Sequence, residues 1–512
     1  MKIQKVQNFF LVVFFLALIS IPLLLVNTKS GKISSAENRV LANFPTIKEV
    51  GGGFNKNFLE EFEMWFNDNL GLRDEFVRSN TILQYNLFGK LTKTDTLVGS
   101  ENWLYYVTPN ILKDYQHLNL PTNQQLEDWG GALKTIDNYL KGSGIPFITM
   151  INLDKKTIYP EHYPKSILKV GGNSRTDILL DYLVNKVRLD VFTPEKSLLK
   201  AKETTTVYSP RYDNAHWNSY GAFLGYQDLM DRVKKYYPNI KTLSWEDFEI
   251  KPYEREFNLY NAIHFKETDL SFKLKKNSTA IEEKDKFANL NLIHGDLSVA
   301  YKNEDTKLPK LLILGDSYLY GYLTPYLAES FSEMNFIYTD NISRLKTFVD
   351  LYKPDIVLYE NVERMLDNTL PLLKTSADSF LKYDGYLNLP VENDPSFWLD
   401  YTNGNFVENQ KQIKVDSTKN ITNLVGWALD TKSSSPATNV YLKVDDKYYS
   451  GEYGIPRQSV ADAFSNNDLI NSGFSINIDT KELLNAGEVS FIIISNNREY
   501  QYSPITMKII KE

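Results

Sequence analysis

A serine, a histidine and an aspartate on two short segments have the types and local settings that nucleophilic catalysis needs. Ser317 ends the stretch "LLILGDS", where Gly315 allows the backbone to turn sharply beside it. A turn between a strand and a helix exposes a side chain and leaves backbone N–H groups free to stabilise an oxyanion. A serine also needs a base, and the base needs an orienting acceptor. Asp213 and His216, in "YDNAHWNSYGA", supply both types.

Either segment alone is weak evidence. Gly-Asp-Ser is a common turn, and His216 could be a buried imidazole that is hydrogen-bonded within a core. The G-x-S-x-G elbow, which uses the same geometry, does not occur around Ser317. The two segments together, in a chain with the strand and helix pattern described next, favour a triad of Ser317, His216 and Asp213.

The elements around these residues have the order of an α/β domain. The runs "IPFITMINL", "KLLILG" and "DIVLYEN" are apolar enough to be strands buried in a parallel sheet. "NQQLEDWGGALKTIDNYLKGSG" and "AFLGYQDLMDRVKKYY" have the character of helices, and Thr324-Pro325 resembles the start of another. We therefore expect a parallel sheet flanked by helices over residues 29–393. The polar stretch from about 244 to 306 is predicted to be an insertion.

The two ends of the chain differ from this central part. Residues 9–26 carry no charge and are long enough to cross a bilayer core of about 30 Å. No small-x-small cleavage pattern follows, so residues 1–28 are predicted to be an uncleaved single-pass signal anchor in the cell membrane, with the bulk of the chain outside. "NFLEEFEMWFNDN" is predicted to be an amphipathic helix that ends near Leu70-Gly71. Residues 394–512 have the short β runs and regular turns of an all-β sandwich.

Composition restricts the function further. The formal net charge is −7 and no basic patch is evident, which argues against nucleic-acid binding. The chain has no cysteine, so disulfides, thiolate zinc sites and cysteine nucleophiles are excluded. The other histidines are scattered without the spacing of metal ligands, and the sequence predicts neither a metal nor a cofactor.

Seven blocks of the sequence resemble one protein family, in that family's order. The chain resembles the SGNH-type esterase superfamily and, within it, the alginate O-acetyltransferase (AlgJ/AlgX-like, DHHW) branch. The histidine block precedes the serine block, as in the acetyltransferase branch and unlike ordinary SGNH enzymes. The blocks are "ENRVLANFP", "FNDNLGLRD", "ENWLYY", "NLDKKTIYPE", "AHWNSYGA", "LGDSY" and "VLYENVERML".

One position departs from the pattern of this branch. The branch typically has D-x-H-W, with its aspartate two residues before the histidine, but Asn214 occupies that position here. Asp213 lies three residues before His216, which matches the D-x-x-H of ordinary SGNH enzymes. Either Asp213 orients the imidazole, or Asn214 does so as a neutral acceptor, or the site is degenerate; we expect Asp213 to be the orienting residue.

The resemblance implies a cell-surface polysaccharide O-acetyltransferase, or an acetylesterase, that works through an acyl-enzyme on Ser317. His216 would act first as base and then as acid. The acetyl donor would be a membrane-bound O-acyltransferase partner. Transfer and hydrolysis share the covalent step, so the sequence does not separate them. The alternative is a catalytically silent polysaccharide-binding or assembly protein that keeps the SGNH fold, which Asn214 would permit.

Several other side chains could contact a glycan. Trp103, Tyr105, Lys155 and Arg364 lie in the blocks that resemble the family, and each could equally have a structural role. In the C-terminal part, Trp427 could stack on a sugar ring or form the core of the sandwich.

Overall fold

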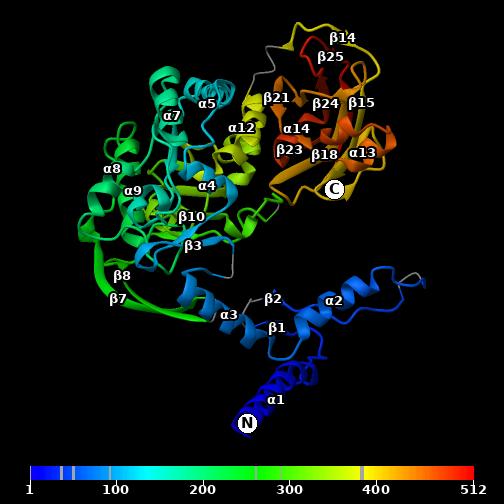
Figure 1. Cartoon of the computed structure of the whole chain (residues 1–512). Coiled ribbons are helices and arrows are strands. Elements are labelled where there is room, and N and C mark those ends of the chain that lie inside the picture. The colour runs from blue at the N-terminus through cyan, green and yellow to red at the C-terminus, as the bar shows by residue number, and fades with distance from the viewer. Residues whose placement is uncertain are drawn as a thin grey trace.

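The computed structural model describes residues 2–34, 39–48, 52–91, 94–259, 262–288, 290–380 and 386–512. Figure 1 shows three parts along the chain: N-terminal helices, a central α/β domain and a C-terminal β domain. The first two residues of the block "ENRVLANFP" lie outside the described residues.

The central domain is built on one mixed sheet of seven strands in the order β6-β5-β13-β11-β12-β10-β9. The five strands from β6 to β12 run parallel, and β10 and β9 are antiparallel to their neighbours. The parallel strands are almost wholly buried because their sequences are apolar on both faces. The strands are β5 (Phe147–Asn152), β6 (Val191–Phe192), β9 (Ala280–Glu282), β10 (Val299–Asn303), β11 (Lys310–Gly315), β12 (Glu333–Tyr338) and β13 (Ile356–Val362).

Helices cover both faces of this sheet. Alternate residues of β11 separate the two cores: Ile313 packs in one with α9 (Ser219–Val233), and Leu312 packs in the other with α5 (Asn123–Gly142) and α12 (Leu366–Phe380). The SGNH-like sheet flanked by helices that the sequence predicts is therefore confirmed. The smaller helices are α4 (Pro109–Tyr115), α6 (Lys155–Ile158), α7 (Arg175–Asp181), α8 (Glu195–Ala201), α10 (Thr324–Ala328) and α11 (Leu345–Tyr352).

The segment predicted as an insertion, residues 244–306, consists of two parts with different structures. Its first half is a long antiparallel ribbon of β7 (Phe248–Leu259) and β8 (Ile263–Leu274). The prediction is wrong for the second half of this segment, which is part of the core and not an insertion, because β9 and β10 join the central sheet at one edge. β10 lies one strand in from the edge, and only Ala300 and Asn303 of its residues are buried, so it appears polar in the sequence.

The C-terminal domain has two β-sheets that enclose a separate core. One sheet contains β18 (Ile421–Asp430) and β23 (Gly473–Asp479), and the other contains β20 (Asn439–Val444) and β24 (Glu488–Ile494). Apolar residues of both sheets meet in one cluster, as a sandwich requires. The additional strands are β14 (Val391–Glu392), β15 (Ser396–Thr402), β16 (Asn405–Phe406), β17 (Gln412–Val415), β19 (Ser435–Pro436), β21 (Lys447–Ser450), β22 (Glu452–Ile455), β25 (Gln501–Tyr502) and β26 (Ile505–Lys511), with helices α13 (Gln458–Ala463) and α14 (Thr480–Ala486).

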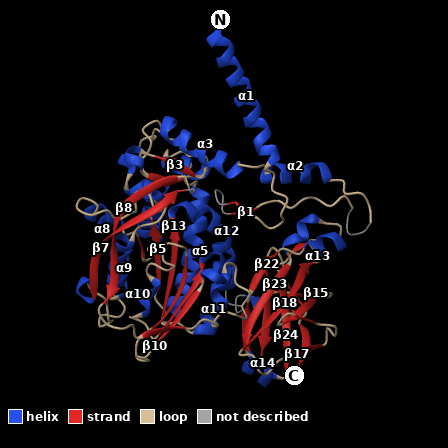
Figure 2. Ribbon diagram, turned by 90° about the horizontal axis from the view of Figure 1, so that it is seen from below, coloured by secondary structure: helices blue, strands red, loops and turns tan. Residues whose placement is uncertain are grey.

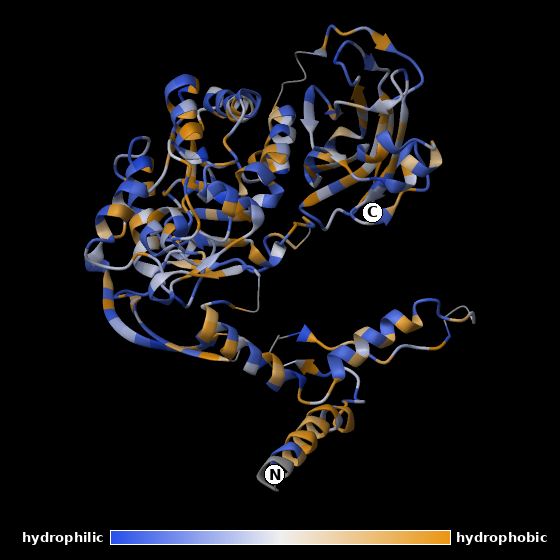
Figure 3. Cartoon of the chain, viewed as in Figure 1, coloured by the Kyte–Doolittle hydropathy of each residue, from blue (hydrophilic) through white to orange (hydrophobic). Residues whose placement is uncertain are grey.

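Three helices form the N-terminal part. α1 (Lys2–Leu24) projects away from the rest of the molecule, and its segment Val6–Leu24 is long and apolar enough to cross a membrane, by length and composition (Figure 2). α2 (Phe58–Asn69) and α3 (Arg73–Phe88) follow, with the predicted break at Leu70 and Gly71. Figure 3 shows α1 as predominantly hydrophobic along its length. Two further short pairs are β1 (Ile33–Ser34) with β2 (Arg39–Val40), and β3 (Thr96–Val98) with β4 (Leu104–Tyr106).

Candidate active site

Ser317 lies immediately after the carboxyl end of β11, at the centre of the sheet. The turn is fixed by Asp316, whose buried carboxylate accepts the backbone N–H groups of Tyr318 (2.8 Å) and Val362 (2.7 Å). The backbone N–H of Ser317 has no partner among the residues that the structure describes. This N–H is therefore free to donate to an oxygen bound beside the serine hydroxyl.

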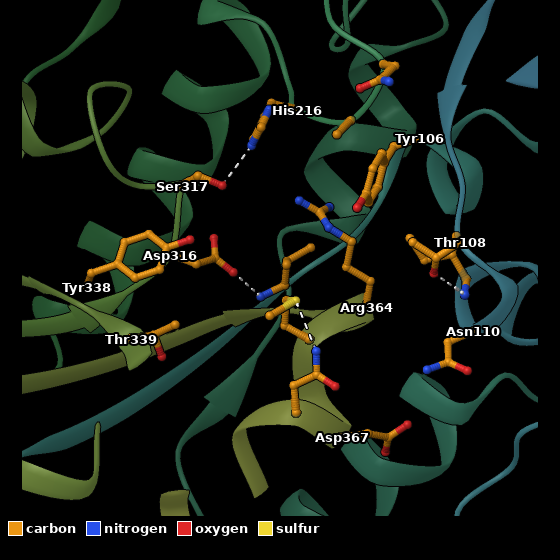
Figure 4. Close-up of a pocket in the computed structure, with 16 residues that line it drawn as sticks. Tyr106, Thr108, Asn110, His216, Asp316, Ser317, Tyr338, Thr339, Arg364 and Asp367 are labelled. Atoms are coloured by element: carbon orange, nitrogen blue, oxygen red, sulfur yellow. Dashed lines mark hydrogen bonds between the residues drawn. The ribbon is translucent and has the colours of Figure 1, made fainter. Parts of the chain in front are cut away.

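His216 lies on a loop before α9, opposite Ser317. Ser317 Oγ donates to His216 Nε2 at 2.9 Å, and His216 Nδ1 donates to Asp213 Oδ2 at 3.0 Å. The assignment of these donors follows from the ionised carboxylate, which only accepts. The His216 side chain is 22% exposed, so a substrate can reach it. The structure thus brings together the three side chains that the sequence proposes as a triad, and Figure 4 shows the bond between Ser317 and His216.

Two further hydrogen bonds join the histidine and serine segments. Trp217 Nε1 donates to the carbonyl of Tyr318 at 3.0 Å, and the Tyr318 hydroxyl donates to the carbonyl of Ala215 at 2.7 Å. Both bonds are buried, where such bonds are strong and costly to break. The neighbours of the two reacting side chains therefore fix the distance between them.

Asp213 and Asn214 point to different partners. Asp213 Oδ1 accepts the backbone N–H groups of Ala215 (2.7 Å) and His216 (2.9 Å). Burial raises the pKa of Asp213, but the hydrogen bond and charge of His216 and the two backbone donors outweigh burial, so its pKa lies well below the usual range. Asn214 Nδ2 instead donates to Thr96 Oγ1 at 2.8 Å. In this geometry Asp213 orients the imidazole and Asn214 anchors the loop to β3.

Lys155 stabilises the same loop through buried hydrogen bonds. Its Nζ donates to the carbonyl of Leu104 at 2.8 Å and, by a short bond, to the carbonyl of Asp213. The residue is only 1% exposed. Burial lowers the pKa of Lys155 to about 7, against the attraction of Asp213 and Glu267. Lys155 therefore acts as a positioning residue in this structure and does not line the cavity, which is the structural alternative that the sequence leaves open for it.

The β7–β8 ribbon holds the loop from the other side. Glu267 on β8 accepts the backbone N–H of Arg211 at 3.1 Å and the hydroxyl of Ser209. The Arg255 guanidinium lies 3.9 Å from the ring centroid of Tyr212, in a cation–π contact. The ribbon, which the sequence suggests is outside the core, thus supports the segment that carries Asp213 and His216.

A cavity of about 420 Å³ opens in front of Ser317 and His216. Figure 4 shows the guanidinium of Arg364, which follows β13 by two residues, pointing into the cavity. Most of the lining side chains are neutral and polar, which suits an uncharged hydroxyl-bearing ligand. The lining residues are Tyr106, Thr108, Asn110, Ile111, Asn214, Ala215, His216, Asp316, Ser317, Tyr338, Thr339, Val362, Arg364, Met365, Asp367 and Asn368.

Buried charges fix Arg364 in place. Its guanidinium forms a short ion pair with Asp154, and Glu363 accepts the backbone N–H of Asp154 at 3.1 Å. Glu363 also pairs with Lys156 at 2.7 Å. Although burial lowers the pKa of Arg364, the nearby carboxylate of Asp154 outweighs it and raises that pKa well above its usual value. Arg364 therefore supplies a permanent, immobile positive charge at the cavity wall.

For Trp103 and Tyr105, which the sequence offers either as glycan contacts or as structural residues, the structure favours the structural role. Trp103 (5% exposed) and Tyr105 (1% exposed) are buried in the core beneath Lys155, where Trp103 stacks on His162 and the Tyr105 hydroxyl donates to the carbonyl of Tyr159. Tyr106 lines the cavity instead. Successive side chains of a strand point to opposite sides, so the neighbouring tyrosine is the one that faces a ligand.

Trp427 lies far along the chain from this cavity and does not line it. It is half-buried on β18, packs with Leu429, Val460 and Leu469, and lies directly opposite Trp398 of β15. Trp398 is 40% exposed. Trp398 and Trp427 are thus cross-strand neighbours in the register of β15 and β18, and the Trp427 ring contacts Phe464. The sequence analysis identified only Trp427.

A sheet with helices on both faces and a serine–histidine–aspartate arrangement at the ends of its strands defines an SGNH hydrolase-like domain. Residues 96–318 match the family described as "SGNH hydrolase-like domain, acetyltransferase AlgX". The match covers less than half of the chain and supports the sequence resemblance to the AlgJ/AlgX-like SGNH branch. No curated protein matches the chain.

Several solved structures are similar to the chain. Bacillus cereus PatB1 has 16% identity and a TM-score of 0.40, and the match covers 53% of this chain and 96% of that one. The O-acetyltransferase domain of Pseudomonas putida AlgJ has 13% identity and a TM-score of 0.34, covering 55% and 99%. Pseudomonas aeruginosa AlgX has 10% identity and a TM-score of 0.35, covering 81% and 90%.

Proposed function

We propose that the chain is a membrane-anchored O-acetyltransferase that acetylates hydroxyl groups of a cell-surface polysaccharide through an acetyl-Ser317 intermediate. The observation that carries this proposal is that His216 bridges Ser317 and Asp213 at 2.9 and 3.0 Å beside an open cavity. The acetyltransferase description of the matching family supports the choice of acyl group.

In the first half-reaction, the Ser317 hydroxyl attacks the carbonyl carbon of a donor acetyl ester while His216 Nε2 takes its proton. Asp213 stabilises the imidazolium that results. The oxyanion lies toward the free backbone N–H of Ser317 and the guanidinium of Arg364. The tetrahedral intermediate collapses, the donor alkoxide leaves with the proton from His216, and acetyl-Ser317 remains.

In the second half-reaction, a hydroxyl of the polysaccharide enters the cavity and gives its proton to His216 Nε2 as its oxygen attacks the acetyl carbon. Ser317 leaves and recovers the proton. Tyr106, Asn110 and Asn368 offer hydrogen bonds to the neighbouring hydroxyls of the acceptor. Water in place of the sugar would give hydrolysis, so exclusion of water from the cavity decides the outcome.

The membrane anchor and the donor form the second part of the proposal. α1 crosses the cell membrane once, which leaves the catalytic and β domains on the outer side. A membrane-bound O-acyltransferase in the same bilayer supplies the acetyl group. The Trp398–Trp427 pair on the C-terminal domain gives a polysaccharide a stacking surface separate from the catalytic cavity.

The test is to incubate the purified chain with 4-nitrophenyl acetate as donor and to search for one acetyl group on Ser317 by mass spectrometry of peptides. We expect acetyl-Ser317, its loss in Ser317→Ala, and its retention in the control Ser271→Ala, an exposed serine on β8. Acetylation that persists at the same rate in Ser317→Ala would overturn the proposal. A chain that binds polysaccharide but never acylates would instead establish the silent assembly protein.

A further inference from the structure

Helix α3 has two opposite faces. On one face Thr81 is 1% exposed, and the Tyr85 ring meets the Phe265 ring of β8 at 6.0 Å. At 100° per residue, Phe76, Leu83 and Leu87 lie on the other face. These three side chains are 43%, 52% and 66% exposed. Such a row of large apolar side chains in water is unfavourable and marks a contact surface. We call Phe76, Leu83 and Leu87 the apolar row of α3.

The start of α3 is joined directly to the end of α1. The backbone N–H of Gly71 donates to the carbonyl of Pro22 at 3.0 Å, and that of Asn27 donates to the carbonyl of Asn69 at 2.8 Å. A Cβ on Gly71 would lie 2.4 Å from Leu25 Cβ, so only glycine permits this approach. α3 therefore begins at the level where the apolar segment of α1 ends.

The apolar row faces the same side as α1. Figures 1 and 2 both show α3 between the catalytic domain and α1, with α1 leaving on the side away from the domain. Since Tyr85 faces the domain through β8, the row on the opposite side of α3 faces the side from which α1 leaves. If α1 crosses a bilayer, the row lies next to the surface of that bilayer.

We infer that α3 rests in the interface of the bilayer that α1 crosses, with the apolar row inserted at the boundary between headgroups and acyl chains. This inference rests on the proposed anchoring by α1. Leucine and phenylalanine on one face of a helix gain free energy there in proportion to the apolar area that they bury. The first two turns of α3 carry two basic and two acidic residues, Arg73, Arg78, Asp74 and Glu75, so attraction to anionic lipid contributes little. The occupant of this surface is thus the lipid itself, zwitterionic or anionic.

The absence of cysteine from the chain allows one spin label to be placed at a chosen site. Leu83→Cys places it on the apolar row, and Leu168→Cys is the matched control, because Leu168 is a leucine of the catalytic domain that is 72% exposed. Each labelled full-length chain is reconstituted into phosphatidylcholine vesicles, and the vesicles are recovered by flotation. Power-saturation EPR then compares the accessibility of the label to oxygen, which concentrates in lipid, with its accessibility to a water-soluble nickel chelate.

We expect both variants to float with the vesicles, oxygen to dominate at position 83, and the nickel chelate to dominate at position 168. Equal nickel accessibility at the two positions would show a water-facing row and overturn the inference while leaving the anchor intact. Failure of the chain to float would remove the anchor and the inference together. Formation of acetyl-Ser317, measured on the same preparations, tests the catalytic proposal independently of either result.

Discussion

The side chains of Asp213 and Asn214 are adjacent in sequence but bond in different directions, so their substitution should have unequal effects. We expect Asp213→Ala to slow the formation of acetyl-Ser317 by about 10³- to 10⁴-fold, because the imidazole loses its orienting carboxylate. Asn214→Ala removes only the bond to Thr96 and should cost less than about tenfold. Rates from stopped-flow release of nitrophenolate give the ranking. A larger effect at Asn214 would assign the orienting role to that residue.

Glu360 should make the stability of the fold depend on pH. It is fully buried beside Asp316, and burial followed by the repulsion of Asp316 raises its pKa well above 4.5. Asn152 Oδ1 has no partner among the described residues, and rotating that amide by 180° would let a protonated Glu360 donate to it. The folded chain therefore keeps a proton that the unfolded chain releases.

From this it follows that stability is highest below pH 4.5 with respect to this group and falls as the pH rises toward the folded pKa. The side chain in Glu360→Gln carries no charge at any pH, so the stability of this variant should fall less steeply as the pH rises. The measurement is thermal unfolding between pH 5 and 9, and we expect the melting temperature of the variant to fall less steeply with pH than that of the wild-type chain. A variant that melts below the wild-type chain at pH 9 would contradict a protonated Glu360.

At the scale of elements, the loop that carries Asp213 and His216 is held between a buried lysine and the β7–β8 ribbon. Lys155→Met removes the donor to the carbonyl of Asp213, and Glu267→Gln weakens the acceptor of Arg211 N–H. Small displacements of a reacting group cost up to about 100-fold in rate. We expect both variants to lower kcat with little change in KM, and Lys155→Arg to rescue poorly, because a planar guanidinium does not reproduce the compact ammonium donor. Unchanged kcat in a folded Lys155→Met variant would reduce the lysine to a packing role.

The sequence was sufficient for elements whose pattern is local. Apolar runs revealed the parallel strands, and a turn after β11 indicated Ser317 as the exposed residue. The sequence was insufficient where the orientation or burial of a side chain depends on residues far away in the chain. Tyr105 and Tyr106 are adjacent residues of the same type, so the sequence alone does not show which one faces the cavity. Their orientation depends on how β4 packs in the folded chain. A fully buried lysine is rare, so nothing local distinguishes Lys155 from an exposed one.

The same limit explains the edge of the sheet. β9 and β10 are short and half-polar, and their place beside β12 depends on residues that follow later in the chain. By contrast, the break between α2 and α3 was predictable, because Leu70 and Gly71 interrupt the apolar spacing.

At the scale of the whole molecule, the C-terminal domain is fastened to the catalytic domain by several contacts. Ser450 Oγ donates to the carbonyl of Ser379 at 2.7 Å, and Ser343 Oγ donates to Glu452 at 3.1 Å. A polymer held by the Trp398–Trp427 pair would therefore be kept at a fixed distance from Ser317. In the proposed function, polysaccharide binding and the chemical step belong to different domains, so they should respond separately to substitution.

The double variant Trp398→Ala/Trp427→Ala should bind the cell's own surface polysaccharide about tenfold more weakly, as expected for a loss near 1.4 kcal/mol. Acetyl-Ser317 formation from the small donor should be unaffected. Isothermal titration gives the affinity, and Phe406→Ala, an exposed aromatic of the same domain, is the control. Equal affinities in the double variant and the control would leave the domain with a structural role.

The close packing of Gly71 against Leu25 has a consequence for how the molecule meets other components of the membrane. A domain on a flexible tether samples a volume, and its local concentration at any one partner falls with about the −3/2 power of the tether length. In this chain, hydrogen bonds and close packing join the end of α1 directly to the start of α3, so no flexible tether lets the domain sample such a volume. If α1 crosses a bilayer that also holds the proposed donor, encounters with that donor become a two-dimensional search by lateral diffusion, and only the stretch of polymer that passes at the height of the cavity can react.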